Sequence, residues 1–219
     1  MGEARSAGVR FAFGGAFATA VYTGELRNTK DFDFYICPED RERMIGAIDR
    51  AGLRDLYDHS AYDRTWIYRA NARDVIVDAI WAMANQRAQV DELWLTRGPE
   101  VIIQGERIRA IPIEELIWSK LYVVQRERCD WGDIFSLIDA QPRRIEWQRL
   151  EERLGEDVAL LTGALSVFSW LAPDRVQEIP KFLWARLGLA TPRSGTDPEL
   201  TRARAALLDS RPWFRLHDR

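Results

Sequence analysis

Two aspartates in a short strand-like segment are the residues of this chain best suited to chemistry. Asp31 and Asp33 alternate with Phe32 and Phe34, and the segment ends before Pro38. Successive side chains of a strand point to opposite faces, so the two carboxylates share one face. Anions this close resist ionising unless a positive charge lies between them. Mg²⁺ prefers oxygen ligands and takes one or two carboxylates besides water and phosphate. The spacing therefore predicts a magnesium site.

A glycine pair and a third acid extend this pattern. Gly14 and Gly15 stand where an expected strand passes into an expected helix. Glycines there let backbone N–H groups approach a phosphate, and the helix N-terminus adds positive potential. Asp78 lies inside the apolar run Val75–Ile80. Charged residues are rarely buried without a partner, so we expect Asp78 to supply a second metal position or a base beside an attacking hydroxyl.

A glycine turn, a D-x-D strand and a third acid on a later strand resemble the signature of the DNA-polymerase-β-type nucleotidyltransferase superfamily. Within it, the segments FGGA (13–16) and RNTKDFD (27–33) are most similar to small prokaryotic nucleotidyltransferase-like proteins related to the AbiEii and MenT toxins. The resemblance covers about residues 9–140. One departure is Gly15, because many active members have serine there. The change removes a side-chain phosphate ligand and leaves that work to the backbone amides.

The resemblance implies an enzyme that uses Mg²⁺ to move a nucleoside monophosphate from an NTP to an acceptor hydroxyl. The acceptor would be a tRNA, a small molecule such as an antibiotic, or a protein side chain, and an antitoxin would be a further partner. Asp31, Asp33 and Asp78 would be the catalytic metal ligands. Nucleotide binding is implied for a further set of residues: Gly14, Gly15, Thr29 and Lys30.

A lysine in the second half of the chain adds to this site. The apolar pattern of residues 113–126 predicts a helix with Lys120 on its inner side. A lysine there snorkels outward or meets an anion. In the AbiEii and MenT-like relatives a lysine of a comparable helix meets the triphosphate, which implies a catalytic and nucleotide-binding Lys120. Residues 126–134 resemble their R-x-x-x-D-x-x-D-I element, so Asp130 and Asp133 are expected at the nucleotide site near this lysine.

Each of these features also has a purely structural explanation. The D-x-D pair can be incidental acids on an exposed strand, the glycine pair a tight turn, and Asp78 a strand-end acid. Lys120 can snorkel to solvent. Asp130 and Asp133 can cap the next helix. The alternative function is a non-catalytic protein of the same fold that binds nucleotide or a partner.

Composition limits the class of protein. The chain has 219 residues, of which 47% are hydrophobic and 11% aromatic, enough for a substantial core and against disorder. A net charge of −3 gives no support to general nucleic-acid binding. Two cysteines are too few for a disulfide framework. The longest uncharged apolar stretch, 158–173, is shorter than the roughly 20 residues of a membrane span. With no secretory leader visible, we expect a cytoplasmic protein without a membrane segment.

The elements that must position these residues change character along the chain. Alternating or apolar runs predict strands at 9–13, 31–37, 65–69 and 75–81, a hairpin within 100–112, and helices at 16–22 and 39–51. Beyond Pro112 the pattern is helical, at 113–126, 131–140, 147–154, 158–171 and 179–187, with a linker at 193–198 and a last helix from Pro198. The sequence therefore predicts an α+β fold, with a small mixed-sheet nucleotidyltransferase domain at 1–112 followed by an α-helical domain at 113–219.

Overall fold

The fold is α+β, as predicted. The computed structural model describes residues 1–26, 29–103, 105–191 and 198–208. The chain divides into two compact units, Met1–Ser119 and Lys120–Arg219, which we call the sheet unit and the helical unit. The division falls within a helix that begins at Ile113, the first residue of the predicted second domain. That the two parts, 1–112 and 113–219, act as separate functional domains stays a prediction.

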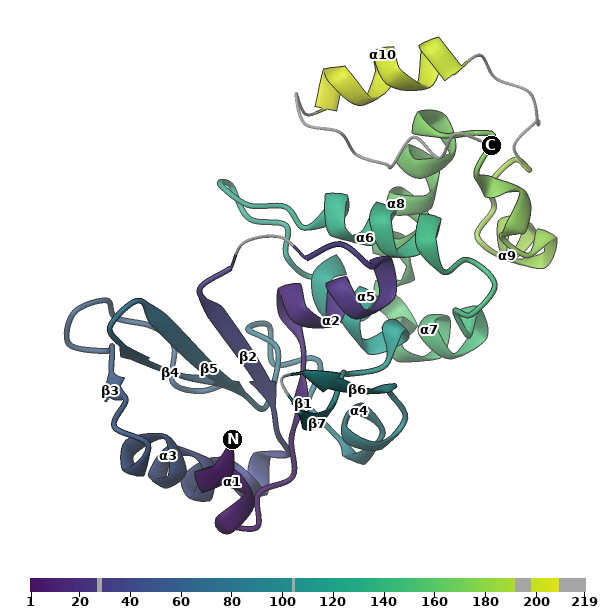
Figure 1. Cartoon of the computed structure of the whole chain (residues 1–219). Coiled ribbons are helices and arrows are strands. Elements are labelled where there is room, and N and C mark those ends of the chain that lie inside the picture. The colour runs from purple at the N-terminus through teal and green to yellow at the C-terminus, as the bar shows by residue number, and fades with distance from the viewer. Residues whose placement is uncertain (27–28, 104, 192–197, 209–219) are drawn as a thin grey trace. The chain divides into compact units, whose positions relative to one another are not determined.

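A five-stranded mixed sheet forms the centre of the sheet unit (Figure 1). Its order is β1 (Ala12–Phe13), β2 (Asp31–Tyr35), β5 (Val75–Ile80), β4 (Ile67–Ala72) and β3 (Arg54–Asp55). Strands β2 and β5 are parallel, and the other neighbours are antiparallel. Strands β6 (Glu100–Ile103) and β7 (Glu106–Arg109) form the predicted hairpin.

The sheet unit contains the helices α1 (Gly2–Ser6), α2 (Gly15–Thr23), α3 (Arg41–Arg50) and α4 (Glu92–Thr96). It also contains most of α5 (Ile113–Leu121), whose last two residues belong to the helical unit. Helix α1 was not predicted, and the strand expected from Val9 begins only at Ala12. The intervening backbone closes α1 instead, since the amide of Val9 donates to the carbonyl of Ala4. A 3-10 turn, Pro38–Asp40, leads into α3.

The alternation of β2 separates an apolar face from an acidic one. Phe34 and Ile36 are buried, and Phe32 is half-buried. These residues belong to a core that includes side chains of α1, α3 and β7. Beside this core lies an apolar cavity of about 310 Å³, whose lining includes Phe13, Phe17 and Phe32. The core therefore anchors β2 by one face, and the other face carries Asp31 and Asp33.

The helical unit contains α6 (Trp131–Ala140), α7 (Trp147–Leu154), α8 (Val158–Leu171), α9 (Lys181–Arg186) and α10 (Pro198–Leu208) (Figure 1). Helices α6, α7 and α8 have the predicted bounds. Phe135 of α6 and Phe168 of α8 are fully buried, with ring centroids 5.8 Å apart. Of the predicted linker, 193–197 lies outside the described residues.

The predicted helix 113–126 ends early, at Leu121. Val124 pairs with Cys129 in an antiparallel bridge, and the amide of Gln125 donates to the carbonyl of Arg128 at 2.8 Å. The chain therefore makes a small hairpin where the apolar pattern predicts more helix. Valine is branched at Cβ, which lowers its helix propensity and suits this extended conformation.

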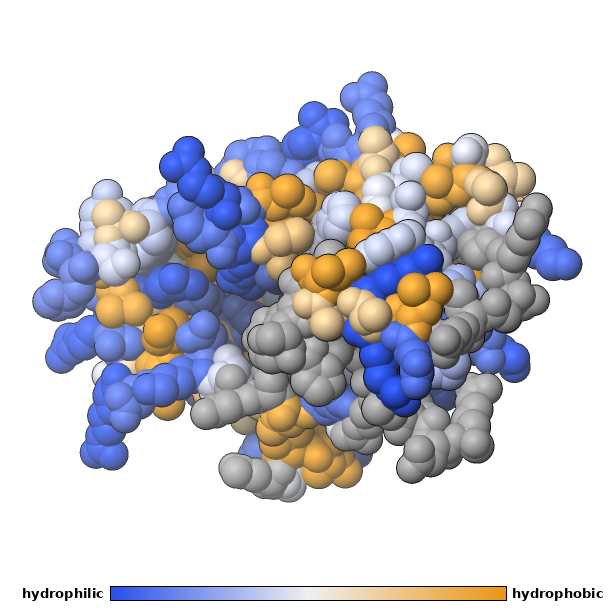
Figure 2. All heavy atoms as spheres, turned by 90° about the horizontal axis from the view of Figure 1, so that it is seen from above, coloured by the Kyte–Doolittle hydropathy of each residue, from blue (hydrophilic) through white to orange (hydrophobic). Residues whose placement is uncertain are grey.

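One stretch, Trp147–Leu171, has the length and composition of a membrane span, with a mean hydropathy of 1.3. The backbone is interrupted at Gly155, where φ is +53°, and α8 alone has 14 residues. That is fewer than the roughly 20 residues that cross a bilayer. On the face drawn in Figure 2, apolar and polar side chains are intermixed in the described parts. The cytoplasmic location stays a prediction.

Candidate active site

The central strands place the predicted acids on one face of the sheet. Asp33 of β2 lies directly opposite Asp78 of β5 in the parallel register, and Asp31 is two residues before Asp33 on the same side. Neighbouring strands are about 4.8 Å apart, so these side chains share one small region. Asp78 is only 2% exposed, whereas Asp31 and Asp33 are half-buried. The prediction that a D-x-D strand and a later acid converge is therefore consistent with the strand register.

Arg69 of β4, which the sequence did not single out, holds the buried acid. It is the register partner of Asp78 on the antiparallel side of β5. Its Nε donates to Asp78 Oδ1 at 2.8 Å, and its second terminal nitrogen donates to Asp78 Oδ2 at 2.6 Å. The hydrogen bond to Asp78 raises the pKa of the guanidinium; burial lowers it, and the charges of Asp78, Asp31 and Asp33 raise it again. The acidic face therefore contains its own permanent cation.

The glycine turn touches the D-x-D pair directly. Gly14 is the N-cap of α2 and its N–H donates to the carbonyl of Asp33 at 3.0 Å, so this amide is used within the sheet. A Cβ on Gly14 would lie 2.0 Å from the ring of Tyr35. The backbone of Gly15 has a φ of +53°, and a Cβ there would lie 1.7 Å from Oδ2 of Asp33. A serine at position 15 would therefore require the Asp33 carboxylate to move.

The first turn of α2 remains the expected phosphate position. The first N–H groups of a helix have no acceptor within the helix, and they carry partial positive charge. The amide of Gly14 already donates to Asp33. The predicted phosphate contacts would therefore come from the backbone N–H groups of Gly15 and the turn that follows it. Phosphate binding at this turn stays a prediction.

Thr29 and Lys30 shape the entry into β2. The hydroxyl of Thr29 accepts from the amide of Asp31 at 3.2 Å, and the carbonyl of Lys30 accepts from the amide of Ile76 at 2.9 Å. These contacts start the parallel pairing of β2 with β5. The side chain of Lys30 is exposed. Contact of either side chain with a nucleotide stays a prediction, and Arg27 and Asn28 of the same motif lie outside the described residues.

Lys120 belongs to the helical unit and is buried against two acids. Its Nζ lies 2.6 Å from Asp133 Oδ2 and 3.2 Å from Asp130 Oδ2. Arg128 also reaches Asp130, with Nε 2.8 Å from Oδ1. The lysine therefore meets the anions that the resemblance implies beside it, and it does not snorkel, since its side chain is only 5% exposed. Its contact with a triphosphate stays a prediction.

We expect Arg128→Gln to raise the pKa of Asp130. Burial works to raise this pKa, but the hydrogen bond from Arg128 and the charges of Lys120 and Arg128 outweigh it and lower the pKa below its ordinary value. A lowered pKa stabilises the fold above the ordinary value, and this contribution is lost as the pH falls through the folded-state pKa. An NMR titration of the Asp130 carboxyl measures the change. Arg126→Gln, an exposed neighbour, is the control, and an unchanged Asp130 pKa in Arg128→Gln would contradict the expectation.

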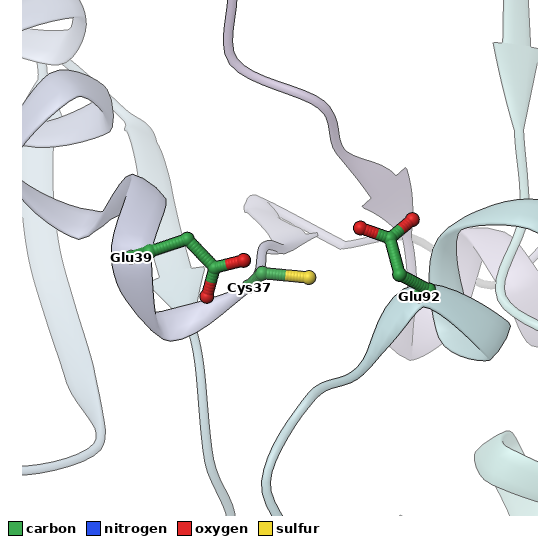
Figure 3. Close-up of side chains that lie close together, drawn as sticks. All are labelled: Cys37, Glu39 and Glu92. Atoms are coloured by element: carbon green, nitrogen blue, oxygen red, sulfur yellow. The ribbon is translucent and has the colours of Figure 1, made fainter.

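A second group of possible metal ligands includes one carboxylate that is paired with an arginine and one thiol that stays protonated. Among the residues that the structure describes, Cys37, Glu39 and Glu92 have ligand atoms within 4.8 Å of one another (Figure 3). Arg10 donates to both oxygens of Glu92, at 2.6 Å for Oε2. Burial, and then the charges of Glu39 and Glu92, raise the pKa of the Cys37 thiol to about 11. A protonated thiol and an occupied carboxylate make this a poor metal centre.

The role of Asp31, Asp33 and Asp78 as a set of three metal ligands stays a prediction. Asp31, Asp33 and Asp78 are not gathered within the same 4.8 Å in the described part of the chain. Both oxygens of Asp78 accept hydrogen bonds from Arg69. A metal at Asp78 would therefore compete with Arg69, whereas no such contact is described for Asp31.

Comparison with known proteins gives similar structures only. No family model matches the chain, and neither does any curated protein. The antibiotic-resistance factor ANT(2'')-Ia is 21% identical, with 78% of this chain and 90% of that chain covered and a TM-score of 0.45. The lincosamide adenylyltransferase LnuA is 14% identical, with 61% of this chain and 87% of that chain covered and a TM-score of 0.43. A nucleotidyltransferase-like protein from Paracoccidioides brasiliensis is 20% identical, with 75% of this chain and 88% of that chain covered and a TM-score of 0.44. All three TM-scores are below 0.5, so the function is argued from the residues of this chain.

Proposed function

We propose that this chain is a metal-dependent nucleotidyltransferase that moves a nucleoside monophosphate from an NTP to an acceptor hydroxyl. The observation that supports this proposal is the register of β2 and β5, which sets Asp33 opposite Asp78 with Asp31 on the same face. The N-terminus of α2 lies against that face, because Gly15 contacts the Asp33 carboxylate. A pair of carboxylates beside a helix N-terminus suits a metal–triphosphate complex, since the acids attract the metal and the helix attracts the phosphates.

The carboxylates of Asp31 and Asp33 suit a divalent cation. They are hard oxygen donors two residues apart on one strand face, and both are half-buried. Mg²⁺ commonly takes one or two carboxylates and fills its other positions with water and phosphate. A bound Mg²⁺ would neutralise phosphate charge and orient the reacting oxygens.

The chain's own groups would do the remaining work. The acceptor oxygen would attack the α-phosphorus, the bond to the β-phosphate would break, and pyrophosphate would leave. The carboxylate of Asp78 would take the hydroxyl proton through lone pairs that Arg69 does not use. The N-terminus of α2 would hold phosphate oxygens through backbone N–H groups. Lys120 would neutralise charge on the leaving pyrophosphate, with Asp130 and Asp133 holding its side chain.

Transfer of an α-phosphate label tests this proposal. The full chain is incubated with MgCl₂ and each NTP, labelled at the α- or the γ-phosphate, together with total tRNA, aminoglycoside and lincosamide antibiotics, or cell protein. We expect label from the α-labelled NTP only, on one acceptor class, and none after addition of EDTA. Label from the γ-phosphate would show phosphoryl transfer and contradict the proposal, as would the absence of any labelled acceptor. The labelled class identifies whether tRNA, a small molecule or a protein is the acceptor.

A second candidate is a non-catalytic protein that binds nucleotide or a partner such as an antitoxin. One observation favours it: both oxygens of Asp78 already bind Arg69. Calorimetry separates the two functions. Nucleotidyl transfer requires NTP binding that depends on Mg²⁺ and is lost in Asp33→Ala. NTP binding that is equal with and without Mg²⁺ would favour the non-catalytic protein.

A further inference from the structure

Arg69 is a charged group of the acidic face that the proposed chemistry does not use. It makes a side-on, two-bond contact with Asp78, at 2.8 Å and 2.6 Å. The planar guanidinium presents two parallel N–H donors in this geometry, which makes the pair stronger and more directional than a single contact. The side chain of Asp78 is 3% exposed and that of Arg69 is 38% exposed, so the carboxylate is the buried partner of the pair.

The contact leaves little room for a metal at Asp78. A cation bound there would have to share or displace hydrogen bonds that already use both carboxylate oxygens. Removing one partner from a buried ion pair is unfavourable, because the remaining charge loses its compensation. A metal held by Asp31 and Asp33 alone does not have to break the contact between Arg69 and Asp78.

The charges of the face agree with this arrangement. Among the described residues, the guanidinium of Arg69 lies near three carboxylates, since the charges of Asp78, Asp31 and Asp33 all raise its pKa. These four groups have a formal charge of −2, which matches one divalent cation. A second divalent cation beside Asp78 would have to compete with Arg69 for the carboxylate oxygens.

We infer that Arg69 is a positioning residue that takes the place of a second metal ion, so that this site binds one divalent cation, at Asp31 and Asp33. The inference rests on the proposed function, since it assumes the metal site that the function requires. In this arrangement the guanidinium of Arg69 orients the carboxylate of Asp78, so that a second metal ion is not needed for this purpose.

Counting bound Mn²⁺ tests the inference. Free Mn²⁺ is followed by electron paramagnetic resonance as it is titrated into the full chain without nucleotide. We expect one tight Mn²⁺ per wild-type chain and a twofold increase, to two, in Arg69→Gln. Arg107→Gln removes an arginine from an exposed ion pair with Glu100 on the separate hairpin, so it serves as the control and is expected to bind one.

The outcomes separate the inference from the proposed function. Two Mn²⁺ in the wild type, or one in both wild type and Arg69→Gln, would overturn the inference and leave the metal site standing. No Mn²⁺ in either chain, or equal binding in Asp33→Asn, would overturn both.

A wild-type measurement keeps the test valid if Arg69→Gln does not fold. The Nε–H resonance of Arg69, assigned by its absence from Arg69→Lys, is followed by NMR during titration with Mg²⁺. We expect it to keep a hydrogen-bonded chemical shift at saturating Mg²⁺. Loss of that shift would mean that the metal displaces the arginine, which contradicts the inference.

Discussion

Asp33→Asn is expected to lower the rate of nucleotidyl transfer by about 10³-fold, the loss seen when a group that stabilises transition-state charge is removed from an enzyme. Asp33 lies opposite Asp78 and beside Asp31, so an amide there removes a negative charge from the centre of the acidic face. Asparagine has nearly the same shape, so the substitution removes the charge with little change in packing. Single-turnover rates with α-labelled NTP measure the loss, and circular dichroism verifies the fold.

Asp74→Asn is the matched control for this variant. Asp74 is an exposed acid in the turn before β5, the strand that carries Asp78. Asp74→Asn changes the net charge by the same amount as Asp33→Asn but leaves the acidic face unaltered. Because surface charges contribute little, its transfer rate is expected to stay within about threefold of wild type. An Asp33→Asn enzyme as active as Asp74→Asn would refute the site.

Gly15→Ala is expected to slow transfer by about 10²-fold, as a misplacement of about 1 Å at a reacting group can do. The new Cβ would lie 1.7 Å from Oδ2 of Asp33, so the carboxylate must rotate away from its place on the acidic face. The backbone also has a φ of +53°, which costs an alanine about 1–2 kcal/mol. We therefore expect weaker Mn²⁺ binding, slower transfer and a lower free energy of unfolding together.

Gly24→Ala separates these two effects. Gly24 closes α2 with a φ of +73°, and a Cβ added there would meet nothing within 4 Å, so alanine has the backbone strain without the overlap. We expect a similar loss of stability, measured by urea unfolding, and an unchanged transfer rate. If both variants slow transfer equally, strain in α2 is the cause and the contact with Asp33 is not.

The arrangement of the acids could be predicted because it depends on alternation. Phe32 and Phe34 alternate with Asp31 and Asp33 along the strand. The two aspartates therefore lie on one face, whichever strands pair with it. The interior position of Asp78 follows in the same way from the apolar residues around it. Helices α6, α7 and α8 were also predictable, because each carries a continuous apolar pattern between polar turns.

Arg69 was missed because its role depends on strand pairing. Strands β4 and β5 meet at a turn of two residues, Arg73 and Asp74, and counting outward from it pairs Arg69 with Asp78. Arg73 has a φ of +53°, a conformation that such turns usually give to asparagine or glycine. Without that signal the register of the hairpin could not be read from the sequence. The early end of α5 was missed for a related reason, because the bridge between Val124 and Cys129 is a pairing that periodicity does not encode.

The borders of the five-stranded sheet affect how the chain behaves in concentrated solution. Strand β1 has two residues, and its outer side is covered where the amide of Ile111 donates to the carbonyl of Phe13. Strand β3, at the opposite border, also has two residues, both charged: Arg54 and Asp55. Long, flat, apolar borders recruit other chains by strand addition, and short charged ones discourage it. The sheet that carries the acids therefore offers a poor template for edge-to-edge aggregation.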